Sequence, residues 1–78
     1  SIAIVGIEVE SERYVEVTRA LKRMDTVETL YTSSGDHMLM AEVRAPDGDA
    51  LGEIIDEDIT ALDGVAAAHP SFLQERLK

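Results

Sequence analysis

Residues 31–40, with the sequence YTSSGDHMLM, constrain the fold more than any other stretch because they combine a turn signal with two flanking strand-like runs. Glycine adopts positive φ without a steric penalty and aspartate tolerates it, so Gly35 and Asp36 suit the two central positions of a tight hairpin turn. Residues 27–33 and 38–44 alternate between two faces, as strands do. These features predict that the chain folds back on itself near its midpoint.

Each half of the chain also contains a second strand-like run and one helix-like run. Residues 2–10 are rich in β-branched side chains and apolar on both faces near their start, which is typical of a central strand. Residues 65–77 form the last run, where Pro70 favours an edge strand because proline cannot donate a ladder hydrogen bond. Apolar residues recurring every three or four positions predict two helices. They are Tyr14, Val17, Leu21 and Met24 within residues 12–24, then Leu51, Ile54, Ile55, Ile59 and Leu62.

Polar and small residues mark the ends of these helices. Ser11 suits the N-cap of the first helix, and Asp47 or Asp49 that of the second, because a side-chain oxygen there accepts a free backbone N–H. Gly64 follows the second helix, where a left-handed glycine commonly ends one. The predicted element order is therefore β-α-β-β-α-β, in one domain over residues 1–78.

This order has a compact α+β solution, a four-stranded antiparallel sheet with both helices on one face and the strand order 4-1-3-2. Residues 2–10 and 38–44, which are both apolar on both faces near their start, fall at the centre of that sheet. Pro70 falls in an edge strand. Residues 27–33, with Val27, Thr29 and Tyr31 on one face and a mixed second face, form the other edge.

Two helices cover only one face of such a sheet. The uncovered face would leave Ile2, Ile4, Met38 and Met40 in water, and burial of apolar area is worth about 25 cal/mol per Å². A chain of 78 residues without cysteine has few other sources of stability. We therefore expect a homodimer in which two sheets pack face to face.

Sixteen acidic and seven basic residues give a net charge of −9. This charge disfavours direct contact with nucleic acid or with an anionic membrane. No apolar run approaches the roughly 20 residues of a membrane span, and no secretory leader is present, so we expect a cytoplasmic domain. The excess of acid would suit a high-salt habitat, where self-repulsion is screened.

The pattern resembles the effector-binding domain of the leucine-responsive regulator/AsnC (Lrp/AsnC) transcription factors, over the whole chain. The likeness lies in the element order and in three short sequences, S-G-D at residues 34–36, A-P-D at 45–47 and L-x-G-V at 62–65. It implies a ferredoxin-like fold, a dimer forming a shared α/β barrel, and often rings of four dimers. It also implies that DNA is contacted by a helix-turn-helix elsewhere in the chain or on a partner.

The resemblance further implies that an amino acid or related effector binds between dimers, near the glycine-containing hairpin. The matching loop positions are Ser34, Gly35 and Asp36, followed by His37 where an aromatic residue is usual and Met38 where a second acid is usual. Ser71 and Phe72 match positions in the last strand that influence the response. We expect a small-molecule-sensing and oligomerisation domain without a cofactor or catalytic chemistry.

Two alternatives stay open. One is an assembly module that binds nothing small, in which Gly35-Asp36 is an ordinary turn. The other is a small dimeric α/β-barrel enzyme of the monooxygenase type, which should have a deep pocket inside one subunit. The sequence has no cysteine and no phosphate-binding glycine motif, which leaves few candidates for catalysis.

The two histidines, His37 and His69, are 32 positions apart. A metal pair would need them close together with a carboxylate, and nothing in their spacing indicates this. We expect no metal site and interpret both as ordinary polar residues.

Overall fold

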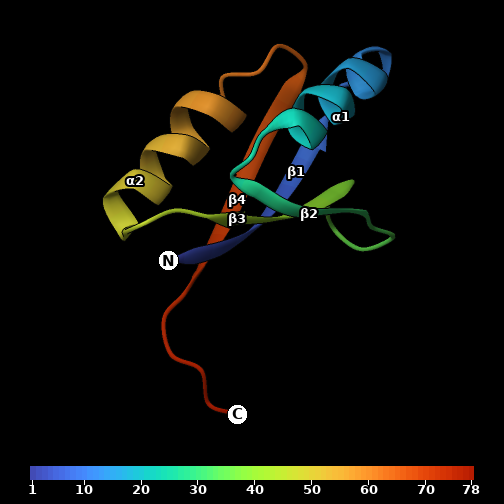
Figure 1. Cartoon of the computed structure of the whole chain (residues 1–78). Helices are drawn as coiled ribbons and strands as arrows, with labels where there is room; N and C mark the ends of the chain where they lie inside the picture. Colours follow the sequence, from blue (N-terminus) through green and yellow to red (C-terminus); the bar gives the residue numbers. More distant parts are fainter.

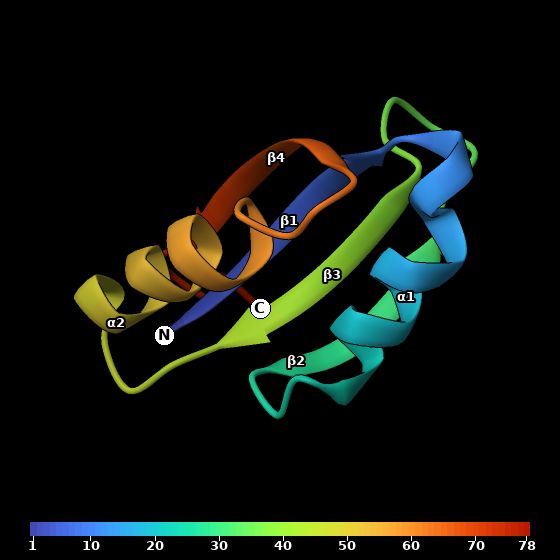
Figure 2. The same ribbon diagram turned by 90° about the horizontal axis from the view of Figure 1, so that it is seen from above.

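A computed structural model describes the whole chain, residues 1–78, as a four-stranded sheet with both helices on one face (Figures 1 and 2). The elements are β1 (Ile2–Val9), a 3₁₀ turn (Ser11–Arg13), α1 (Tyr14–Arg23), β2 (Val27–Thr32), β3 (Leu39–Arg44), α2 (Gly48–Glu53) with a π-helical continuation (Ile54–Ile59), and β4 (Val65–Leu73). The strand order β2-β3-β1-β4 is the predicted order read from the opposite edge, and every pairing is antiparallel. The predicted architecture is confirmed.

The hydrophobic core lies between the sheet and the helices. Alternate residues of the central strands point into it, and one stripe of each helix meets them. None of the buried residues is polar or charged. The core residues are Ala3, Val5, Ile7, Val9, Val17, Leu21, Leu39, Ala41, Val43, Leu51, Ile55 and Ile59.

The other face of the sheet carries no helix. Residues directly opposite in antiparallel strands share a face, so Ile4 lies beside Glu42 and Ser71 on this open face. Tyr31, opposite Met40, is 62% exposed. None of the helices has the length and apolarity that crossing a bilayer requires.

The connection between β2 and β3 differs from the predicted tight turn. Residues 33–38 separate the two strands, and Gly35 is outside the left-handed region, since Gly64 is the one residue with positive φ. The backbone N–H of Ser33 donates to the carbonyl of Met38 at 3.0 Å, which closes a wider loop. The wider loop lets His37 and Met38 contact β1 instead of extending β3.

The start of the first helix also differs from the prediction, because of a contact across the molecule. Ser11 makes no capping hydrogen bond and lies in the 3₁₀ turn, so its predicted role as the N-cap is wrong. The backbone N–H of Glu10 instead donates to the carbonyl of Gly64 at 2.8 Å, which ties this corner to the start of β4. The N-cap predicted at Asp47 is confirmed, because its carboxylate accepts from the backbone N–H of Ala50 at 2.8 Å.

A bulge near the start of β2 moves Val27 to the helix-covered face. The register shifts between Val27 and Thr29, so that Val27 pairs with the buried Val43. Simple alternation wrongly places Val27 on the face of Thr29 and Tyr31. The gain is one more apolar side chain packed against the core.

Gly64 has the predicted left-handed conformation, with φ of 101°, but it does not end the helix. The helical segment ends at Ile59, and Gly64 lies in the turn before β4. A Cβ atom there would lie 2.4 Å from Cβ of Arg13, so the corner also requires the absence of a side chain. Arg13 makes ion pairs with Glu16 and Asp63 at 2.9 and 3.4 Å. The hydrogen bond that Arg13 donates to the carboxylate of Glu16, with the nearby Asp63 charge, raises the pKa of Arg13 above its ordinary value.

Candidate functional site

The residues predicted to bind an effector fall into separate places on one chain. Residues 34–36 are exposed in the loop at the end of the sheet where Ile7 pairs with Leu39. Ser71 and Phe72 pair with Ile4 and Ala3, nearer the other end of β1. Four residues of strand span about 13 Å. One chain therefore does not bring the loop and the β4 positions together.

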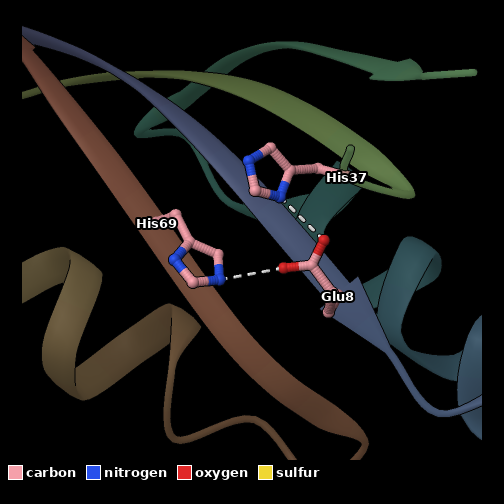
Figure 3. A group of neighbouring side chains, drawn as sticks. All are labelled: Glu8, His37 and His69. Atoms are coloured by element: carbon pink, nitrogen blue, oxygen red, sulfur yellow. Dashed lines mark hydrogen bonds and ion pairs between the residues drawn. The ribbon is translucent and has the colours of Figure 1, made fainter. Parts of the chain in front are cut away.

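His37 leaves this loop and lies over β1 on the open face of the sheet (Figure 3). Its ring occupies the space above Gly6, where a Cβ atom would be 2.3 Å from Cδ2 of the imidazole. A glycine inside a strand often marks a close approach of this kind. Gly6 is therefore the residue that allows His37 to reach the sheet.

Glu8 stands between the two histidines (Figure 3). Its Oε1 atom is 2.7 Å from Nδ1 of His37, and its Oε2 atom is 3.1 Å from Nε2 of His69. The two imidazole rings stack with centroids 5.0 Å apart and an angle of 26° between their planes. The structure thus joins three titratable side chains from β1, β4 and the β2–β3 loop.

The strand register explains why His69 reaches this place. His69 is opposite Gly6, so Glu8 and His69 are diagonal neighbours on one face of β1 and β4. The side chains of Glu8 and His37 are each 30% exposed, and that of His69 is 56% exposed. The cluster is partly shielded by the sheet and open on one side.

The carboxylate of Glu8 is incompletely satisfied. Its Oε2 atom is buried and has no hydrogen bond, because the contact with His69 is an ion-pair distance without hydrogen-bond geometry. No lysine or arginine forms an ion pair with Glu8. A carboxylate has acceptor capacity on both oxygens, so this site retains room for a cationic partner.

Sequence spacing did not predict the cluster. Nothing in the spacing of the two histidines indicated that they meet, yet their rings stack against each other. A signal was available in Gly6, which interrupts a run of β-branched residues in a central strand. Pairing β1 with β4 would then have placed His69 opposite that glycine.

Comparison with known proteins places this chain in a family. Residues 2–78 match the family model described as the Lrp/AsnC ligand binding domain. The chain belongs to this family. The resemblance seen in the sequence is confirmed.

Curated relatives of the Lrp/AsnC family are longer than this chain. The HTH-type transcriptional regulator LrpA1 of the halophile Halobacterium salinarum is 70% identical over 78 residues, which are all of this chain and 55% of the relative. The HTH-type transcriptional regulator LrpA of Pyrococcus abyssi is 43% identical over 77 residues, again 55% of its length. The chain therefore spans about half of the regulators it matches.

Solved structures confirm the ferredoxin-like fold of the Lrp/AsnC domain. Escherichia coli AsnC superposes with a TM-score of 0.90 at 19% identity, over 99% of this chain and 52% of AsnC. A Neisseria meningitidis transcriptional regulator in complex with L-Met also gives 0.90, at 14% identity, over 99% of this chain and 51% of that one. FFRP-DM1 gives 0.84 at 20% identity, over 90% of this chain and 93% of its own.

Proposed function

We propose that this Lrp/AsnC domain binds an amino acid or a closely related molecule and couples that binding to the assembly of a transcriptional regulator. The observation that carries the proposal is the family match over residues 2–78. The L-Met complex of the Neisseria meningitidis regulator supports the amino-acid class. As part of such a regulator the domain would act in the cytoplasm.

The exposed loop offers groups that suit an amino acid. Backbone N–H groups around Gly35 would bind an α-carboxylate, and the carboxylate of Asp36 would bind an α-amino group. The N–H of Gly35 donates to Oγ of Ser33 at 3.1 Å, so an effector carboxylate would replace that bond. Because Ser71 and Phe72 lie toward the other end of β1, an effector that contacts both groups would bind between chains.

Pairing of two sheets is the first step of the proposed assembly. The open face carries Ile4 and Met40, both half-buried within one chain, and a second copy would remove them from water. An effector bound between such dimers would stabilise one arrangement over another in proportion to its differential affinity for the two. DNA contact would come from a helix-turn-helix region, since the regulators named HTH-type are longer than this chain.

The enzyme alternative receives less support. A hollow of about 450 Å³ lies along α2 and its continuation, away from the open face, and no hydrophobic residue lines it. It is lined by Gly48, Asp49, Gly52, Glu53, Asp56 and Glu57. A hydrolytic or oxidative active site would need a shaped, partly apolar pocket with convergent polar groups.

A thermal-shift screen of the twenty amino acids at several salt concentrations, followed by sedimentation of each hit, tests the proposed function. A ligand at a hundred times its Kd should stabilise the chain by about 2.7 kcal/mol. Asp36→Asn should reduce that shift, whereas Asp56→Asn, an exposed acid outside the loop, should leave it unchanged. Stable assembly without a shift from any amino acid would favour the assembly module instead.

The dimer is tested separately by light scattering after size exclusion. Ile4→Glu places a charge on the open face and should yield monomers, because burying an unpaired carboxylate between two sheets is costly. Val15→Glu is the matched control, since Val15 is 62% exposed on α1. A wild-type chain that stays monomeric at micromolar concentration would contradict the sheet-to-sheet dimer.

A further inference from the structure

We propose that Glu8, His37 and His69 form a binding site for a divalent transition-metal ion, best suited to Zn²⁺, on the open face of the sheet. One ligand atom from each residue lies within 4.8 Å of the other two. The three residues come from β1, β4 and the loop before β3 (Figure 3). The site shares His37 with the predicted effector loop, but it includes none of the proposed effector contacts at residues 34–36.

The donor set selects the class of metal. Two imidazoles with one carboxylate are a common set for zinc sites that keep a fourth position open. Imidazole nitrogen also suits Cu²⁺, Ni²⁺ and Co²⁺, whereas Mg²⁺ and Ca²⁺ prefer shells made of oxygen. The site should therefore discriminate against the two hard cations that bind acidic surfaces.

The distances are close to those of a metal centre. Ligand atoms at about 2.1 Å from a tetrahedral ion are about 3.4 Å from one another. The carboxylate oxygens of Glu8 are 2.7 and 3.1 Å from the facing nitrogens of His37 and His69. The ligand atoms lie within 4.8 Å of one another. The two short contacts would therefore open by a few tenths of an ångström, and the widest separation would close toward about 3.4 Å, as the ion displaces the shared proton.

The fold holds all three ligands in place before any ion binds. Glu8 and His69 project from adjacent paired strands, so their separation is fixed by the sheet. His37 is set by its ring, which lies against the bare backbone of Gly6 and stacks on His69. Such preorganisation lowers the entropy cost of gathering three side chains around an ion.

The unsatisfied oxygen of Glu8 is an independent observation for a cationic ligand. A buried carboxylate oxygen without a hydrogen bond is costly, and Oε2 of Glu8 is the one buried side-chain atom of this kind in the structure. A metal ion would satisfy it. The open face is the one that a second copy covers in the proposed dimer, so the fourth ligand would come from a water held between the two sheets or from a group of that copy.

The test is a titration of the 78-residue chain with Zn²⁺ against a chromophoric competitor, with Co²⁺ absorption as a second readout. We expect one ion per chain and intense visible bands of a four-coordinate Co²⁺ site. Glu8→Gln and His69→Gln should each weaken Zn²⁺ binding by about tenfold or more, since each removes a direct ligand. Glu53→Gln is the matched control, because it removes an exposed acid of α2 outside the cluster.

Either of two outcomes would overturn the proposal. Equal Zn²⁺ affinity in the wild type and in His69→Gln would show binding elsewhere on the acidic surface. Equal stabilisation by Mg²⁺ would show non-selective screening. Circular dichroism of the metal-free variants separates loss of a ligand from loss of fold, and His69 is exposed enough for its replacement to leave the fold intact. These readouts need no effector, so failure of the metal proposal can be distinguished from failure of the proposed sensing function.

Discussion

Gly6 and His37 share one space on the open face of β1. The ring of His37 lies where a side chain at position 6 would begin, and the same contact directs Nδ1 of His37 toward Glu8. The strand accepts a glycine that costs it about 0.5–1 kcal/mol relative to alanine. The close approach of the ring gives a physical reason for glycine at this position.

Gly6→Ala should therefore destabilise the chain by about 1–3 kcal/mol, because the new methyl group and the ring cannot both fit. In a His37→Ala background the same change should be neutral or stabilising, since the clash is gone and alanine is the better strand residue. Chemical denaturation of the four proteins in a double-mutant cycle measures the coupling. An equal cost of Gly6→Ala in both backgrounds would show that His37 does not occupy this space.

The ends of the helical elements show how far local sequence signals reach. Asp47 caps α2 through its own loop, with partners only three residues away, and the sequence predicted it. Ser11 has the same type of side chain and makes no cap, because the backbone of Glu10 is tied to Gly64 across the molecule. A long-range contact therefore overrode the local signal before α1, and no such contact competes with the cap before α2.

Asp47→Ala should lower the free energy of unfolding by about 1 kcal/mol, through loss of the bond to Ala50 and of a negative charge at the helix start. Ser11→Ala should change it by less than about 0.5 kcal/mol, as expected for an exposed residue without a partner. Urea denaturation followed by circular dichroism compares the two. A larger loss at Ser11 than at Asp47 would contradict the assigned caps.

The hairpin shows a further limit of sequence reasoning at this scale. Gly35-Asp36 has the composition of a two-residue turn, and the apolar alternation on both sides correctly predicted the two strands. The loop is wider because His37 and Met38 gain contacts with Glu8 and Val9, which are 29 positions away. Turn propensity is local, so it contains no information about such partners.

At the scale of the whole molecule, the strand order followed from periodicity, burial on two faces and the position of Pro70. These are averages over many residues, so single errors such as the face of Val27 did not disturb them. The Glu8, His37 and His69 cluster depends instead on one register between β1 and β4 and on one loop. A single sequence carries little information about one strand register or about the conformation of one loop.

Net charge is the property of the whole chain with the clearest physical consequence. The charge of −9 is spread over a small surface, and acids crowd the exposed positions of α2 and its continuation, where Asp49, Glu53, Asp56 and Glu57 are close in sequence. Like charges one helical turn apart repel by a few tenths of a kcal/mol per pair. A relative that is 70% identical to this chain comes from the halophile Halobacterium salinarum.

Raising KCl from dilute buffer to molar concentration should therefore raise the Tm, because the Debye length falls from about 30 Å at 0.01 M to about 3 Å at 1 M. The double variant Asp56→Asn, Glu57→Gln removes part of the repulsion, so its Tm should exceed that of the wild type in dilute buffer, and the gap should narrow in molar salt. Differential scanning calorimetry at matched protein concentration measures both effects, with sucrose as a control that stabilises without screening. Equal Tm values of the wild type in dilute and molar KCl would mean that self-repulsion does not limit this fold, since screening acts on every exposed pair of charges at once.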